Sequence, residues 1–156
     1  MNTPPDTQHP GILNPVGHVM LAFRTEADLQ RALPHLLELG LGVVPLVHIL
    51  PQDMLVQVDI ALKSSGLLAG FGQELNLATA HRDMALVGCS FLLLPVVDGV
   101  QGQLVADIAR SFGAVSGQHY GQLVITEVID PGSDAQLARI LQGHRLDAPG
   151  SAPAAD

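Results

Sequence analysis

Hydrophobic and polar positions alternate in two separate stretches of the chain, and each stretch leads into a helical pattern and then a second apolar run. Two units with a strand-helix-strand order therefore follow one another. Their residue ranges are 18–24, 25–39 and 43–50 in the first unit, and 89–97, 98–112 and 114–125 in the second. Two β-α-β units within about 110 residues are typical of a ferredoxin-like sheet, which belongs to the α+β class. In that fold we expect residues 18–24 and 89–96 to be adjacent, parallel strands.

The helix of each unit begins after a residue that favours an N-cap. Thr25 precedes the first helix, with Asp28 three residues later in a near capping box, and Asp98 precedes the second helix. Gly40 suits the position just after the end of the first helix. Pro34 falls inside this helix, where an interior proline costs roughly 3 kcal/mol, so the pattern predicts a kink or a late helix start.

A helical insertion, residues 51–88, separates the two units. One helical pattern starts at Pro51 and ends near Ser64, and a second covers residues 73–87. The sequence therefore predicts a ferredoxin-like sheet with a helical hairpin inserted between its second and third strands. The two crossover helices are expected to cover one sheet face. The other face is also apolar, so we expect either the inserted helices or a second subunit to cover it.

The flanking segments define the domain. Residues 1–16 contain four prolines and no apolar periodicity, which predicts a disordered arm. Residues 17–130 are expected to form a single domain that includes the insertion, in keeping with a length of 156 residues. Residues 131–156 are expected to form a short helix, 134–142, and a disordered tail rich in Ala, Pro and Gly.

Charge and composition disfavour several classes of partner. The net charge is −8, and the seven basic residues are scattered singly. Nucleic-acid binding and binding to an anionic membrane both need clustered Lys and Arg, so neither is expected. The uncharged runs 39–52 and 84–97 are too short for a membrane span, which needs about 20 apolar residues. A lone Cys89 and the lack of a secretory leader pattern predict a cytoplasmic protein.

Three residues form a candidate metal site. If the first and third strands are parallel, His18, His48 and Cys89 fall at one end of the sheet. Two imidazoles and a thiolate are suitable ligands for zinc or copper. The alternative is that the three are unrelated, with Cys89 a small core side chain and His18 in solvent. The sequence indicates no particular cofactor.

The second inserted helix carries a candidate ligand site. Glu74 and His81 are seven residues apart, so they share a helix face at a separation of roughly 10 Å, too far for joint chelation. They are placed to line one pocket and hold the two ends of a small polar ligand. His81 and the adjacent Arg82 are suited to engaging a small anion. The alternative is an outward face of solvated charges.

A His-Tyr pair between two glycines extends this candidate site. Gly117 and Gly121 flank His119 and Tyr120, and glycines in a strand permit close approach of a ligand or a second backbone. His119 offers an imidazole, and Tyr120 is able to donate a hydrogen bond. The alternative is a β-bulge or bend, with Tyr120 closing the core.

Residues 19–41, VMLAFRTEADLQRALPHLLELGL, resemble the opening unit of small bacterial proteins of the general-stress type, most of them uncharacterised. Those proteins also begin with a short strand, a T/D-x-E-like cap, an Ala/Leu-rich helix and a glycine. The resemblance implies a bacterial protein with a role in the stress response. It is limited to the first β-α unit and carries over no functional residues.

The sequence contains none of the common catalytic or nucleotide-binding motifs, including the Walker-type loop, GxGxxG, CxxC, HExxH and GxSxG. Together with the scattered charge and the apolar second sheet face, this predicts a non-enzymatic module that binds a small ligand or another protein and forms a homodimer. The alternative is a small metal-binding protein or enzyme that uses either the metal set or the ligand set described above.

Overall fold

The computed structural model describes residues 15–39, 46–64 and 72–130. Its helices and strands, in chain order, are β1 (His18–Phe23), α1 (Glu26–Leu37), β2 (Val47–Ile49), α2 (Pro51–Ser64), α3 (Gly72–Leu86), β3 (Ser90–Pro95), α4 (Gly99–Ser111), β4 (Ala114–Tyr120) and β5 (Ile125–Ile129). The first 14 residues of the expected arm, and the expected C-terminal helix and tail, lie outside the described residues.

All five strands belong to one sheet with the order β2-β3-β1-β4-β5, and every pair of neighbours is antiparallel. His18 lies opposite Pro95 and Phe23 lies opposite Ser90, so β1 and β3 run in opposite directions. The predicted ferredoxin-like fold, with parallel first and third strands, is therefore wrong, whereas the α+β class is confirmed. The alternation of apolar residues shows which side chains of a strand share a face, but it does not report the direction of the neighbouring strand.

The sheet also has a fifth strand that the sequence pattern did not separate cleanly from the fourth. A tight turn joins β4 to β5, and in it the Gly121 N–H donates to the Val124 carbonyl at 3.0 Å. A Cβ at position 121 would lie only 2.8 Å from that oxygen, so the turn requires glycine. β5 then pairs with β4 along the outer edge of the sheet.

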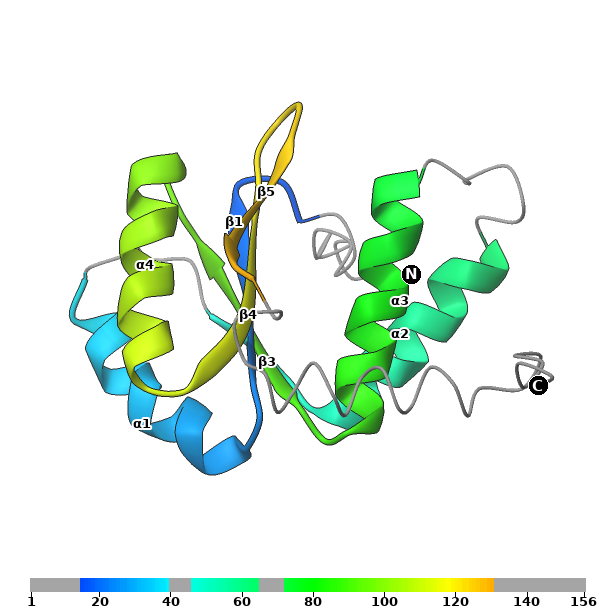
Figure 1. Ribbon diagram of the computed structural model, residues 1–156, viewed down its shortest axis with the longest axis horizontal. Helices are drawn as coiled ribbons and strands as arrows, with labels where there is room; N and C mark the ends of the chain where they lie inside the picture. Colours follow the sequence, from blue (N-terminus) through cyan, green and yellow to red (C-terminus); the bar gives the residue numbers. More distant parts are fainter. Residues whose placement is uncertain (1–14, 40–45, 65–71, 131–156) are drawn as a thin grey trace, which may run out of the picture.

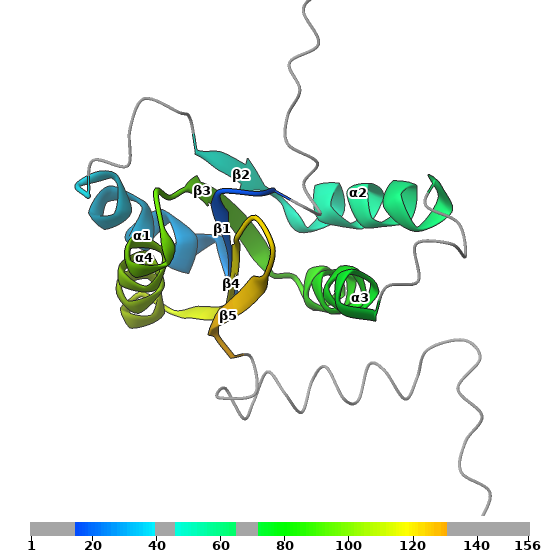
Figure 2. The ribbon, with the colours of Figure 1, turned by 90° about the horizontal axis from the view of Figure 1, so that it is seen from above.

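The helices cover both faces of the sheet, α1 and α4 on one side and α2 and α3 on the other (Figures 1 and 2). Alternate residues of β1 divide between the two cores. Val19, Leu21 and Phe23 are buried on the side of α1 and α4. Met20 and Ala22 are buried on the side of α2 and α3. The inserted helices thus cover the second apolar face, which removes the reason for expecting a second subunit there.

Both predicted N-caps are confirmed. Thr25 Oγ1 accepts from the Asp28 N–H at 3.1 Å, and Asp98 Oδ1 accepts from the Gln101 N–H at 2.8 Å. Helix α1 begins directly after its cap and continues through Pro34. Of the two alternatives expected for this proline, a kink or a late helix start, the late start is therefore wrong. No helix in the described part of the chain is long and apolar enough to cross a membrane.

Candidate functional site

A row of polar side chains lies on β4, on the sheet face that α3 covers. Ser116, Gln118 and Tyr120 are alternate residues of the strand, so their side chains point to the same face. Ser116 is 1% exposed, Gln118 is 2% exposed and Tyr120 is fully buried. The neighbouring strands present apolar residues to this layer, including Met20 and Phe91. Polar groups are therefore concentrated on one strand of an otherwise apolar interface.

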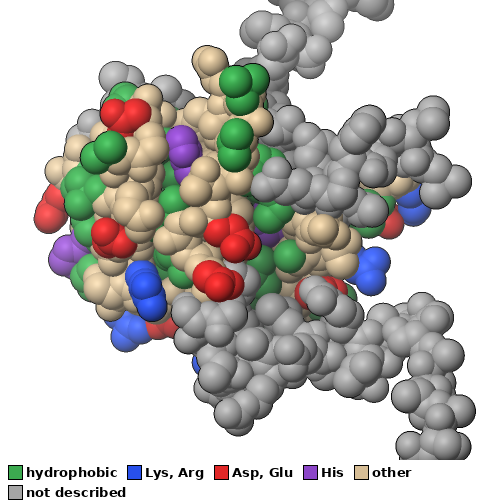
Figure 3. All heavy atoms as spheres, turned by 45° about the horizontal axis from the view of Figure 1, so that its top comes forward, with side chains coloured by type: hydrophobic (Ala, Val, Ile, Leu, Met, Phe, Trp, Pro, Cys, Tyr) green, Lys and Arg blue, Asp and Glu red, His purple; other side chains and the backbone are tan. Residues whose placement is uncertain are grey.

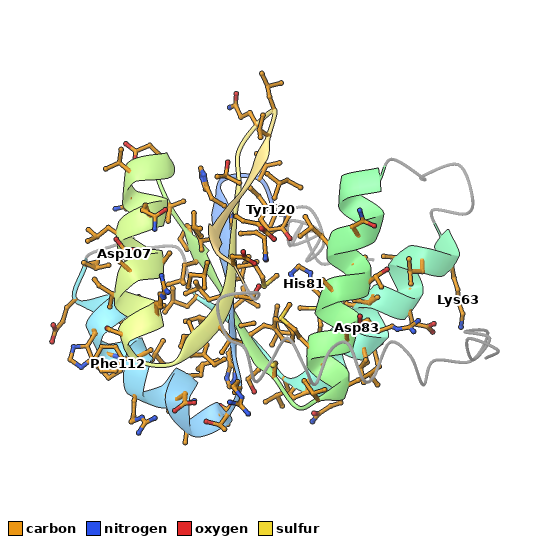
Figure 4. The ribbon with its side chains drawn as sticks, viewed as in Figure 1. Lys63, His81, Asp83, Asp107, Phe112 and Tyr120 are labelled. Carbon is orange, nitrogen blue, oxygen red and sulfur yellow. The ribbon has the colours of Figure 1, made fainter. Side chains whose placement is uncertain are left out.

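His81 of α3 reaches this row from the helical side of the layer (Figure 4). Its Nε2 lies 3.1 Å from Oε1 of Gln118, and Nε2 of Gln118 donates to Oγ of Ser116 at 2.9 Å. Because an amide oxygen can only accept, Nε2 of His81 carries the proton and donates it. The three side chains form a continuous hydrogen-bonded chain from the helix into the sheet.

The other ring nitrogen of His81, Nδ1, is then an unprotonated acceptor. His81 is 1% exposed, and among the described residues its Nδ1 has no hydrogen-bond partner. Burial lowers the pKa of His81 below the ordinary value of 6.5, although the hydrogen bond to Gln118 acts in the opposite direction. The ring is therefore neutral at pH 7 and presents one lone pair inside the layer.

Apolar side chains make up most of the remainder of this layer. The ring of Phe91 meets His81 edge to face, with the centroids 5.8 Å apart and the ring planes at 88°. Met20 and Met84 belong to the same core and are each 1% exposed. No lysine or arginine is buried among the residues that the structure describes, and the buried charged residue of α3, Asp83, is acidic.

The structure brings together only part of the ligand site predicted from the sequence. His81 and Tyr120 lie in the same layer, on the side of α2 and α3. His119 lies on the opposite sheet face, next to α4, where a Cβ on Gly102 would be 3.4 Å from its ring. His119 and Tyr120 are consecutive residues of a strand, so their side chains point to opposite faces and cannot line one site.

The two remaining members of the predicted set have different outcomes. Arg82 is exposed. Glu74 lies in the first turn of α3, and its side chain is outside the described part of the structure. Sequence reasoning missed Ser116 and Gln118. Their signal was the two-residue spacing with Tyr120, which places three polar groups on one face of a strand.

The structure does not bring the three predicted metal ligands together. Because β1 and β3 are antiparallel, His18 at the start of β1 and Cys89 before β3 lie at opposite ends of the sheet. His48 of β2 forms a hydrogen bond with Glu26 instead. The described residues contain no group of three or more His, Cys, Asp or Glu placed to hold a metal ion. The topological argument for this site, which assumed parallel strands, is wrong.

A second polar cluster joins the start of α1 to β2 and β3. Oε2 of Glu26 accepts hydrogen bonds from Oγ of Ser90 at 2.8 Å and from Nε2 of His48 at 3.0 Å, and Gln30 donates to Oε1 at 2.9 Å. Partial burial raises the pKa of Glu26, but the bonds from Gln30, Ser90 and His48 outweigh it, so the pKa is lowered overall.

This cluster does not have the arrangement of a nucleophilic serine. Ser90 donates to the carboxylate and not to the imidazole, whereas an activated serine needs a base that takes its proton. A carboxylate whose pKa is lowered is a weak base. Glu26 therefore serves to hold the first turn of α1 against the strands that carry His48 and Ser90.

No protein-family model, curated protein or solved structure matches this chain. The resemblance of its first unit to general-stress-type proteins stays a prediction. The chemistry of the described side chains is thus the basis for a functional assignment. Of the two polar clusters, only the one at His81 is enclosed in a core and presents a buried acceptor.

Proposed function

We propose that the protein is a small-ligand-binding module without catalytic activity, and that the ligand binds between α3 and the sheet, beside His81. The observation that supports this site is the buried Nδ1 of His81, which has no hydrogen-bond partner among the described residues. A ligand that donates to this nitrogen would extend the hydrogen-bonded chain that runs through Gln118 to Ser116.

The energetics favour a binding role for His81 over a purely structural one. A buried polar group that lacks a partner destabilises a protein by about 1–3 kcal/mol. A phenylalanine at position 81, combined with an apolar residue at position 118, would fill a similar volume beside Phe91 without leaving such a group. A chain with histidine here therefore keeps a locally unfavourable residue, and departures of this kind concentrate at functional sites.

Binding is also favoured over catalysis at this site. A general base has to take up a proton during the reaction, and burial lowers the pKa of His81, which disfavours its protonated form. Nε2 forms a hydrogen bond with the neutral amide of Gln118, whereas the histidine of a Ser-His-Asp triad is supported by a carboxylate that stabilises the imidazolium. A neutral, fixed imidazole is suited to recognising a ligand.

Thermal unfolding of the full chain with a panel of cell metabolites tests the proposal. Wild type is compared with His81→Phe, which removes both ring nitrogens, and with Met84→Leu, a nearly volume-conserving change in the same layer. At least one compound should raise the Tm of wild type and of Met84→Leu but not that of His81→Phe. Equal shifts in all three proteins, or no shift in any, would contradict the proposed site.

A separate observation favours self-association as a second role. Four apolar side chains are strongly exposed at one end of the molecule: Val97 (84%), Val100 (80%), Leu123 (97%) and Val124 (63%). Val97 precedes α4, Val100 lies in its first turn, and the other two residues lie in the β4–β5 turn (Figure 1). Figure 3, which brings this end forward, shows hydrophobic side chains on its surface. Leu123 and Val124 are consecutive residues of an exposed turn, and adjacent exposed apolar side chains of this kind are candidates for a contact site.

Sedimentation velocity distinguishes this second role. We expect wild type at tens of micromolar to sediment as a dimer, and the variant Leu123→Ser/Val124→Ser to sediment as a monomer. Gln122→Ser, an exposed change in the same turn, serves as the control and should leave the dimer intact. A monomeric wild type would rule out self-association through this surface.

A further inference from the structure

The hydrogen-bonded chain at His81 has a direction. Nε2 of Gln118 donates to Ser116, so the amide turns its oxygen toward His81, and that oxygen accepts from Nε2 of the ring. Nδ1 is consequently the acceptor nitrogen of the imidazole. A ligand carbonyl or carboxylate placed at Nδ1 would set two acceptors against each other, whereas a hydroxyl or N–H group would form a hydrogen bond.

The same layer disfavours a charged ligand. Met20 and Phe91 are apolar, and no lysine or arginine is buried among the described residues. The buried acidic residue Asp83 is two positions from His81 on α3, so it faces another side of the helix and offers no partner to a cation in this layer. A carboxylate or phosphate that entered this layer would lose its hydration without gaining a cationic partner, which is strongly unfavourable. Arg82, which the sequence suggested as the partner of an anion, is exposed to solvent.

We infer that the ligand is a small uncharged molecule with an apolar body and one hydroxyl or N–H group, which donates a hydrogen bond to Nδ1 of His81. The inference rests on the binding role proposed above and narrows the class of ligand. The apolar body would pack against Met20 and Phe91, because a flexible methionine side chain adapts to the shape of a bound molecule. This class takes the place of the small anion expected from the sequence.

Three aromatic probes of similar size distinguish the possible classes. Phenol offers a hydroxyl donor, toluene offers an apolar body alone, and benzoate offers an anionic acceptor. Binding to the full chain is followed by NMR titration of the methionine methyl signals in wild type, His81→Phe and Met84→Leu. We expect wild type and Met84→Leu to bind phenol about fivefold more tightly than toluene, the effect of one net hydrogen bond. Benzoate should bind more weakly than either.

The His81→Phe variant is expected to lose the preference for phenol over toluene. If toluene or benzoate binds wild type more tightly than phenol, and His81→Phe weakens that binding, the site stands and the ligand class is wrong. If the preference for phenol survives in His81→Phe, the contact to Nδ1 is wrong. If no probe perturbs wild type, or if each probe binds wild type and His81→Phe equally, the ligand class and the proposed site are both overturned.

Discussion

Replacing the two partners of the buried hydrogen bond, His81 and Gln118, measures how strongly the polar chain couples α3 to the sheet. In His81→Phe, Oε1 of Gln118 loses its donor while it stays buried, which costs about 1–3 kcal/mol. Removal of the unpartnered Nδ1 offsets part of this cost, so the free energy of unfolding should fall by about 1 kcal/mol. In Gln118→Met, both His81 and Ser116 lose a partner, so we expect a loss of about 2–3 kcal/mol, at the upper end of the same range.

The double variant His81→Phe/Gln118→Met should be more stable than the sum of the two single changes implies, because neither an amide oxygen nor a ring nitrogen is then left buried without its partner. Residues that share a hydrogen bond couple by about 0.5–3 kcal/mol, and we expect a coupling of at least about 1 kcal/mol here. Urea unfolding followed by circular dichroism gives the free energies, with the m-value checking that the four proteins unfold alike. Additivity within about 0.5 kcal/mol would refute the reasoning.

A matched control uses the core on the other side of the sheet. Leu29 of α1 is fully buried there and shares no partner with Gln118. Leu29→Met conserves volume and should cost less than about 1.5 kcal/mol. Combined with Gln118→Met, it should be additive within about 0.5 kcal/mol, because the two sites lie in separate layers. Coupling of this control pair would show that the cycle reports a general change in the fold and not the hydrogen bond.

Three further measurements check other parts of the structure. The folded-state pKa of His81 lies below 6.5, so the unfolded chain takes up a proton at a higher pH than the folded protein does. The free energy of unfolding should therefore fall as the pH drops below 6.5, by up to about 1.4 kcal/mol per pH unit. In urea unfolding at several pH values, His81→Phe should show a shallower slope. The pKa of Glu26 lies below 4.5, so the hydrogen bonds to its carboxylate stabilise the fold above that pH. Because this side chain is 44% exposed, Glu26→Gln should lower the free energy of unfolding by only about 0.5 kcal/mol at pH 7. This loss should vanish well below pH 4.5, and a loss that persists there would contradict an ionic role. Gly121→Ala should lower the free energy of unfolding by about 1 kcal/mol or more, because its Cβ would meet the Val124 carbonyl. The control Gly99→Ala makes only ordinary contacts to His119 and should be neutral or slightly stabilising. Equal effects of the two changes in thermal unfolding would argue against the described turn.

Features that depend on residues close together in the chain could be read from the sequence. Thr25 and Asp98 were assigned as N-caps because each needs only a backbone N–H three residues later, and both caps are present. The α+β class and the two helices between β2 and β3 follow from the periodicity of apolar residues for the same reason. His81 was selected as a candidate residue, although its position in a core was not foreseen.

Features that depend on distant residues required the tertiary structure. The alternation of apolar and polar residues within β1 and β3 is the same whether the two strands run parallel or antiparallel. The sequence therefore could not show that His18 lies opposite Pro95 and so at the other end of the sheet from Cys89. The partner of His81 is Gln118, 37 residues further along the chain on a different element. Local patterns record which face of a segment is apolar. The choice of partner depends on the free energy of packing the whole chain, because a buried donor on one segment has to meet an acceptor that another segment supplies.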